Sequence, residues 1–428
     1  MTAGTATFLG SASERLLPPG IVFRFFGTAV IFHAVAWAVV AMHGEQLSEY
    51  RGGSGPILAA LHLVTLGVFT MTAMGASLQL LPVATLQGFA APGAISALWW
   101  LFTAGTICLT VGMYWNSYQA MILGGGAVTL SVVFYLCLLV GNLRQGGAMA
   151  VVVAHGRLAA FFLVVLLVLG LALIINQRTG MLADSQRAGI SHMLLAAYGF
   201  MGLLAMGFSY VLIPMFALAP NPPDRWALLA LICICVGLAL GVTGTWLGRD
   251  AWAAVGGGLG LLGGAVHVAL MVLTLRRRMR KRLGPAFTLI RLSWALFLLS
   301  LLLGTAWTID LSGDWGPAMF GLALLGWLLS LLLAILQRIV PFLASMHAAA
   351  NLKRRPPTVT ALTAPGPLAI HLCCHCGALA LLALGILLNL PLLVKLGAVL
   401  GLAGALAFVW FFYLAMAKFR TALSPLTP

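Results

Sequence analysis

Twelve long apolar stretches run through the chain, and they restrict its fold more than any other feature. The hydrocarbon core of a bilayer is about 30 Å thick, so a helix needs about 20 mostly apolar residues to cross it. Of the 428 residues, 62% are hydrophobic and only 7% are charged, which is too few charges to cover soluble domains. The sequence therefore predicts an all-α polytopic membrane protein. The predicted spans are 21–43, 56–82, 94–114, 118–140, 152–176, 189–214, 226–246, 251–275, 286–308, 317–341, 367–389 and 391–416.

Charged residues alternate between the two sides that these spans define. The net charge is +15, from 23 Lys and Arg against 8 Asp and Glu. The basic runs at 276–282 and 353–355 fall on the side of both termini, and six of the eight acids fall on the other side. The positive-inside rule then predicts cytoplasmic N- and C-termini in a bacterial inner membrane. Because topology accounts for the basic clusters, we expect the lipid bilayer as a partner and no nucleic acid.

An internal repeat relates the second and sixth spans. The motif MGxSxxLxP occupies 74–82 and recurs 132 residues later at 206–214. A glycine stands fifteen residues before the motif's proline in both copies, and Gly326 has the same spacing to Pro341 in the tenth span. We therefore predict three parallel four-helix repeats. They cover about 21–150, 151–282 and 283–416, with cytoplasmic segments at 1–20 and 417–428.

Histidines lie at similar depth in the two copies of the motif. At 1.5 Å per residue, His62 is about 9 Å and His192 about 5 Å below the outer surface, and His33 is about 12 Å below it. Ionisable groups inside a membrane are costly and mark functional sites, and neutral imidazole is the usual axial ligand of heme iron. We predict His62, His192 and then His33 as heme or metal ligands. The structural alternative is one hydrogen bond to a neighbouring helix, just as close helix packing explains the glycines.

The chain resembles the heme-copper oxidase subunit I superfamily in its twelve spans, its three four-helix units and the histidine on the second span. The stretch 61–83 is most similar to the short NnrS-type members. The resemblance implies a heme-binding integral membrane redox protein with heme b and, as a further metal, copper. It also implies electron transfer or nitric oxide and small-gas chemistry near the outer face. A periplasmic cytochrome or cupredoxin and other membrane subunits are the implied partners.

The sequence departs from that family at several functional positions. The tenth span has Met319 and Gly321 where the family has two histidines, and the seventh span has no histidine. Ala196 stands where the family has a cross-linked tyrosine. We therefore expect no conventional oxygen-reducing copper centre. Met319 is a candidate thioether ligand, with core packing as its alternative. No CxxCH motif is present, so any heme is expected to lack thioether bonds.

A second metal candidate lies in the eleventh span, which reads His-Leu-Cys-Cys-His-Cys at 371–376. His371 and His375 share one helix face at i, i+4 spacing. The thiols of Cys373 and Cys376 would suit Cu(I), which favours soft ligands. The alternative is that these small side chains pack between membrane helices.

Two classes of function remain open at this point. The first is a heme-dependent oxidoreductase, and the second is a non-enzymatic carrier, assembly factor or sensor for heme or copper. All eight carboxylates fall in loops or at helix ends, which argues against proton pumping. No hydrolase or ATPase motif is present.

Overall fold

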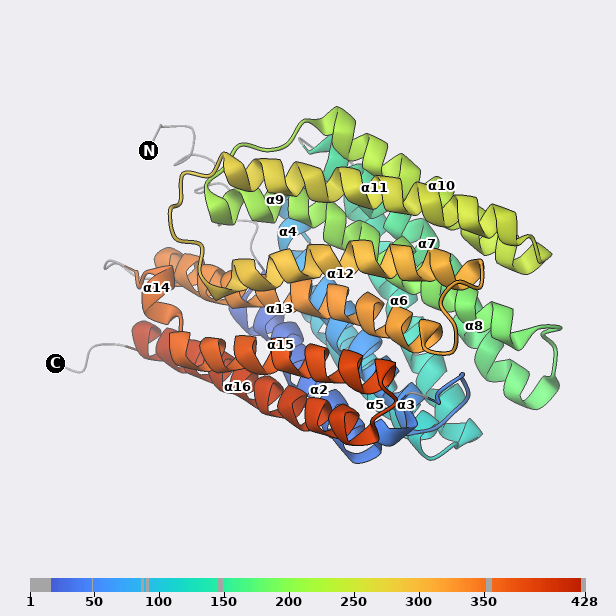
Figure 1. The fold of residues 1–428 in the computed structure, drawn as a ribbon. Helices are drawn as coiled ribbons and strands as arrows, with labels where there is room; N and C mark the ends of the chain where they lie inside the picture. The colour runs from blue at the N-terminus through green and yellow to red at the C-terminus, as the bar shows by residue number, and fades with distance from the viewer. Residues whose placement is uncertain are drawn as a thin grey trace.

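The computed structural model describes residues 17–47, 49–85, 88–89, 92–144, 149–351 and 356–424. These residues form helices and connecting turns, with no strand among them. Twelve of the described helices are long and apolar enough to cross a membrane, and they coincide with the twelve predicted spans. The all-α polytopic class is thus confirmed (Figure 1).

Most spans are single helices, whereas the second and sixth each combine three consecutive elements. The first half of the chain contains α2 (Pro19–His43), η1 (Gly44–Gln46), α3 (Pro56–His62), η2 (Leu63–Thr70), α4 (Met71–Thr85), α5 (Pro92–Tyr114), α6 (Tyr118–Leu143), α7 (Ala150–Thr179), α8 (Ser185–Leu194), η3 (Leu195–Gly202) and α9 (Leu203–Ala217). The second half contains α10 (Asp224–Leu247), α11 (Asp250–Arg276), α12 (Pro285–Thr308), α13 (Gly316–Asn351), α14 (Val359–Leu362), α15 (Pro365–Leu387) and α16 (Pro391–Leu423).

The helix ends follow local sequence signals. Six of the described helices begin with proline, whose missing N–H is unpaired in the first turn anyway. Ser117 and Asp184 cap α6 and α8 by accepting hydrogen bonds from first-turn backbone N–H groups. Gly180 and Gly248 end α7 and α10 in the left-handed conformation, with φ of 62° and 60°.

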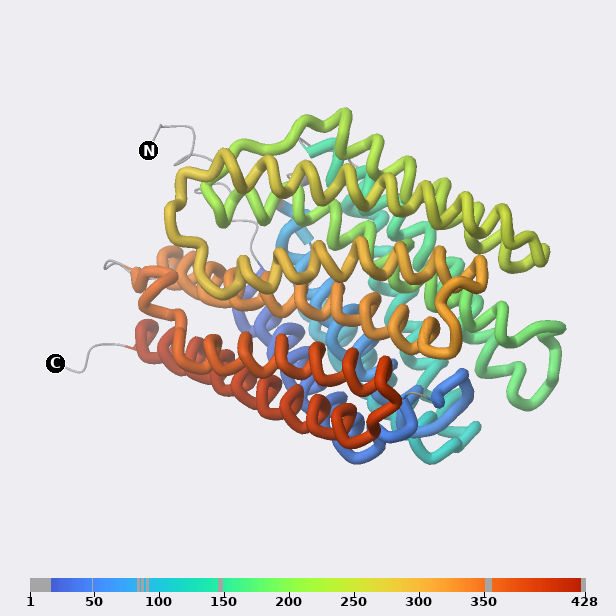
Figure 2. The backbone as a smooth tube through the Cα atoms, viewed as in Figure 1, coloured from blue at the N-terminus to red at the C-terminus, as the bar shows by residue number. Residues whose placement is uncertain are grey.

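Both described ends of the chain lie at one end of the bundle, as Figures 1 and 2 show. We call this the terminal end, and we call the opposite end, with the loops 49–55, 180–184 and 309–315, the far end. The last helix continues to Leu423, so the predicted tail at 417–428 is helical over most of its length. Residues 1–16 and 425–428, and the basic run 353–355, lie outside the described residues.

The three spans that share the sequence pattern are also the most buried. Of the best apolar window in each, 67% is buried for the α3–α4 span, 78% for the α8–α9 span and 83% for α13. The other nine windows are 28% to 50% buried. Around these central spans the helices pack in consecutive pairs, such as α5 with α6 and α10 with α11, and α16 closes the bundle by packing on α2.

Equivalent backbone features recur in the second and sixth spans. The π-helical segments η2 and η3 begin at Leu63 and Leu195, 132 residues apart like the two sequence motifs. A Cβ on Gly67 would lie 2.6 Å from Cγ of Phe32, and one on Gly199 would lie 2.9 Å from Cβ of Phe162. Each glycine thus admits an aromatic ring from the preceding apolar helix. The two copies therefore share packing geometry as well as sequence.

Candidate functional site

His62 and His192 lie against each other, although they are 130 residues apart in the sequence. His62 ends α3 and His192 belongs to the last turn of α8. Their ring centroids are 6.4 Å apart and the ring planes differ by 25°. A metal–imidazole bond measures about 2.0–2.1 Å, so two imidazoles on one ion have centroids roughly 6 Å apart. The structure therefore brings together the two strongest predicted ligands at a separation that suits a shared metal.

The remaining ring atoms of this pair also suit ligands. Nδ1 of His62 donates to the backbone oxygen of Leu58 at 3.0 Å, which leaves Nε2 with a lone pair. Such a second bond orients a metal-bound imidazole. Nδ1 of His192 is buried and makes no hydrogen bond, although the carbonyl of Leu166 is close to the ring. A Cβ on Gly170 would lie 3.0 Å from Cε1 of His192, so this glycine makes room for the ring.

Both imidazoles precede a π-helical segment. His62 stands immediately before η2, and His192 is three residues before η3. Widened π turns inside α-helices occur frequently at functional sites. Here each π-helical segment contains the glycine, Gly67 or Gly199, that packs against the neighbouring helix.

The centroid separation of this pair matches that of two imidazoles that hold one metal ion, such as a heme iron or a copper ion. Within the described ranges, no group of three or more His, Cys, Asp or Glu has the spacing of a metal site. A heme or a two-coordinate ion therefore suits this pair better than a closed four-ligand site.

His33, which the depth estimate groups with His62 and His192, instead lies beside α15. Its ring centroid is 6.2 Å from that of His371, which in turn is 5.5 Å from that of His375. All three imidazoles are buried. The position of His33 along its helix predicted its depth in the membrane, but the packing of α2 beside α16 decides which side chains surround it. We call these three residues the α15 cluster.

Hydrogen bonds fix the tautomers in the α15 cluster. Trp37 Nε1 donates to Nε2 of His33 at 2.9 Å, so the ring hydrogen of His33 is on Nδ1. His371 Nδ1 donates to the carbonyl of Gly404 at 3.1 Å, so its Nε2 carries a lone pair. Nδ1 of His33 and Nε2 of His371 are buried and make no hydrogen bond. Indole only donates and a carbonyl only accepts, so this arrangement cannot reverse its direction to pass a proton.

The predicted copper ligands at 371–376 do not converge. His375 Nε2 shares a hydrogen bond of 2.8 Å with the hydroxyl of Ser330 on α13, whereas Cys373 is exposed and Cys376 is half-buried. Residues two apart on a helix face opposite directions, so the histidines point into the bundle and Cys373 points outward. Met319 lies in the first turn of α13, half-buried against the main core, and no described contact joins it to the His62–His192 pair.

A third histidine group was missed at the sequence level. His267 Nδ1 and the hydroxyl oxygen of Tyr210 are 2.9 Å apart. The ring centroids of Tyr210 and His155 are 5.5 Å apart. His155 Nδ1 donates to the carbonyl of Val151 at 2.8 Å. Tyr210 directly follows the serine of the second motif, which is the only signal in the sequence that points to it.

No family model matches the chain, and no curated protein matches it.

Proposed function

We propose that the chain is a heme-binding membrane redox protein that transfers electrons, with His62 and His192 as axial ligands of a b-type heme. The observation that carries the proposal is the 6.4 Å separation of two imidazoles from different spans near the far end. The resemblance of the sequence to the heme-copper oxidase superfamily, with its NnrS-type members, supports it. A bound heme would supply a one-electron couple.

Neighbouring groups of the protein would hold the two imidazoles that bind the heme. The Leu58 carbonyl holds the ring of His62, and Gly170 gives the ring of His192 its place. If both imidazoles held the iron, they would leave no coordination position for oxygen or nitric oxide, and the bound heme would supply electron transfer rather than gas chemistry. With the terminal end cytoplasmic in a bacterial inner membrane, a periplasmic cytochrome or cupredoxin would reach the far end.

The alternative is a carrier, assembly factor or sensor for heme or copper. The observation that favours it is the small ligand set, because both imidazoles are only half-buried and no third ligand is grouped with them in the described structure. Two ligands release an ion more readily than four.

The visible spectrum of the purified full chain tests the proposal. We expect a Soret band and sharp reduced α-bands, both lost in His62→Ala and in His192→Ala. The matched control is His43→Ala, since His43 also lies at the far end but is bonded to Tyr114 at 2.8 Å. This control is expected to keep the spectrum.

Metal analysis of the same preparations distinguishes the alternatives. Stoichiometric copper without heme, lost in both variants, would support the carrier. A protein that stays colourless and metal-free after growth with added heme and copper would overturn both functions. A heme that survives both substitutions would exclude this pair as its ligands.

A further inference from the structure

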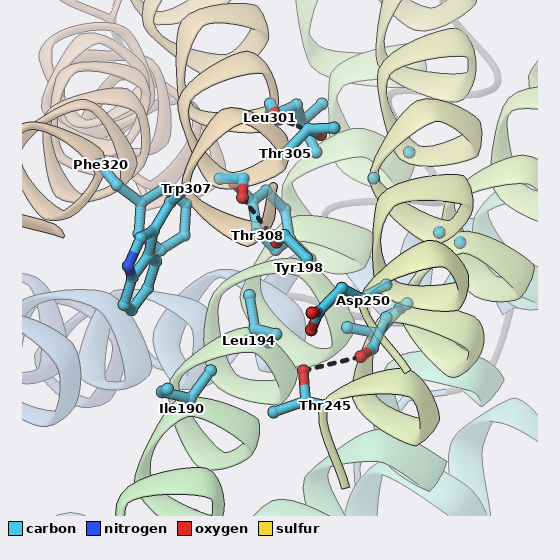
Figure 3. A pocket seen from close by; sticks show the side chains of 18 of the residues that line it. Ile190, Leu194, Tyr198, Thr245, Asp250, Leu301, Thr305, Trp307, Thr308 and Phe320 are labelled. Carbon is cyan, nitrogen blue, oxygen red and sulfur yellow. Dashed lines mark hydrogen bonds between the residues drawn. The ribbon is translucent and has the colours of Figure 1, made fainter. Parts of the chain in front are cut away.

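A cavity of about 440 Å³ opens at the far end between α8, α10, α11, α12 and α13 (Figure 3). Small-molecule sites measure about 300–1,000 Å³, so its size suits a small ligand. Asp184, Arg187 and Asp250 lie at the mouth, and Tyr198 and Ser300 lie at the inner end. Ser300 is eight residues from Thr308 at the end of α12, which places it roughly 12 Å below the mouth.

Glycines keep this cavity open. Gly237 and Gly241 of α10 and Gly256 and Gly260 of α11 line it. A Cβ on Gly256 would lie 2.5 Å from the backbone nitrogen of Gly241, so α10 and α11 approach each other through bare backbone. A Cβ on Gly241 would meet nothing within 4 Å. Its missing side chain therefore leaves space that the ligand can use.

The threonine hydroxyls of the cavity have already used their hydrogens. Thr245, Thr305 and Thr308 each donate to the carbonyl four residues earlier on their own helix, at 2.9, 2.8 and 2.9 Å. A hydroxyl has one hydrogen and two lone pairs, so these oxygens can only accept from a ligand.

The hydroxyl groups at the inner end of the cavity also have their hydrogens in use. The hydroxyl of Tyr198 donates to Ser300 Oγ at 2.9 Å, and Ser300 donates to the carbonyl of Phe297 at 2.7 Å. Both hydroxyls are therefore also limited to accepting. The hydroxyl groups of the cavity thus form a wall of hydrogen-bond acceptors.

The mouth carries one carboxylate without a partner. Asp184 accepts from Nε of Arg187 at 3.1 Å and from its backbone N–H at 2.9 Å, and Arg187 also donates to the carbonyl of Trp246 at 3.2 Å. The charges of Asp184 and Arg187 thus offset each other. Asp250 makes no ion pair or side-chain hydrogen bond in the described part of the chain. The mouth is therefore negative.

Aromatic rings line the remaining wall. Tyr198, Trp307 and Phe320 face the cavity, and the rings of Trp307 and Phe320 are 5.9 Å apart. Such rings bury an apolar body and attract a cation over their faces.

We propose that this cavity binds a small organic ammonium ion that enters from the far end. Its N–H groups would donate to the hydroxyl oxygens, its charge would pair with Asp250, and its apolar part would pack on the aromatic rings. Arg187 is the one charged donor of the lining, and Asp184 offsets its charge. Only the neutral N–H donors of Gln186 and Trp307 remain for an anion, so the site favours a cation. The proposal does not depend on heme.

Isothermal titration calorimetry of the purified full chain with three probes that share a phenylethyl group tests the ligand class. We expect 2-phenylethylammonium to bind, 2-phenylethanol to bind about tenfold more weakly, and 3-phenylpropionate to bind least. Asp250→Asn should weaken ammonium binding about tenfold, whereas Asp314→Asn, an exposed far-end carboxylate outside the cavity, should leave it unchanged.

A second pair of variants tests the place of binding. Gly241→Leu places a side chain in the cavity from a Cβ that would meet nothing within 4 Å, and it should abolish ammonium binding. Gly258→Leu, on the exposed face of α11 and with an equally free Cβ, should retain it. Equal binding of the alcohol, preference for the carboxylate, or full binding by Gly241→Leu would each overturn the proposal. Unchanged heme content in these variants would keep the result separate from the proposed function.

Discussion

The imidazoles inside the bundle differ in what their second ring nitrogen does. In His62 and His371 one nitrogen donates to a backbone carbonyl, so the other is fixed as an acceptor. In His33 the indole of Trp37 fixes the opposite arrangement, with the hydrogen on Nδ1. A neutral His33 therefore offers no lone pair toward His371, which argues against a metal shared by these two residues.

His371→Leu tests the role of the α15 cluster in stability. The variant loses the hydrogen bond to the Gly404 carbonyl, so we expect a loss of about 1 kcal/mol in unfolding free energy. Cys373→Leu, two residues away on the exposed face, should change it by less than about 0.5 kcal/mol. Thermal unfolding in detergent compares the two. Heme content that falls with His371→Leu would instead assign a ligand role to this residue.

Helix packing in this bundle depends on glycines whose neighbours cannot move. A Cβ on Gly124 of α6 would lie 2.6 Å from Cα of Leu109 and would also meet the Leu109 nitrogen. Both are backbone atoms of α5, so the side chain cannot be accommodated by a rotamer change. On the same helix, a Cβ on Gly126 would meet nothing within 4 Å.

Gly124→Ala should therefore push α5 and α6 apart and destabilise the protein by about 1–3 kcal/mol. Gly126→Ala should be neutral or slightly stabilising, because alanine favours helix and no neighbour is displaced. The apparent midpoint of thermal unfolding measures both. Equal midpoints for the two variants would contradict the close approach of α5 and α6.

The arrangement of the whole molecule places the described chain ends together and the candidate sites at the opposite end. Twelve crossings return the chain to the side on which it began. The His62–His192 pair and the cavity that ends at Asp250 both belong to the far-end half. The side of the membrane that the far end faces therefore decides which compartment supplies the electron partner and the ammonium ligand.

Reporter fusions test the orientation. Because the basic runs favour the cytoplasm, a fluorescent protein fused after residue 428 should fluoresce and alkaline phosphatase fused there should be inactive. Phosphatase fused after Gly180, in a far-end loop, should be active. A fusion after Leu283, at the terminal end, is the control and should behave like the C-terminal one. The reverse pattern would place the far end in the cytoplasm.

Much of the fold followed from the sequence because the requirement for crossing a membrane is local. About 20 apolar residues suffice to define a span, whatever its neighbours, and all twelve spans were predicted. The main difference was in α13, which continues beyond the predicted end at 341 to Asn351, and the last helix also continues beyond 416 to Leu423. The repeat also singled out the spans of His62 and His192, and these proved to be central.

The sequence by itself determined which side chains lie in the membrane and at what depth, because depth depends only on position along one helix. Only the tertiary structure decided which of them meet. It paired His62 with His192 and placed His33 beside His371. It also showed that Cys373 lies on the exposed face of α15. It also formed the cavity between α8, α10, α11, α12 and α13. Lateral neighbours depend on how helices distant in the chain pack, and the composition of a single span does not specify that packing.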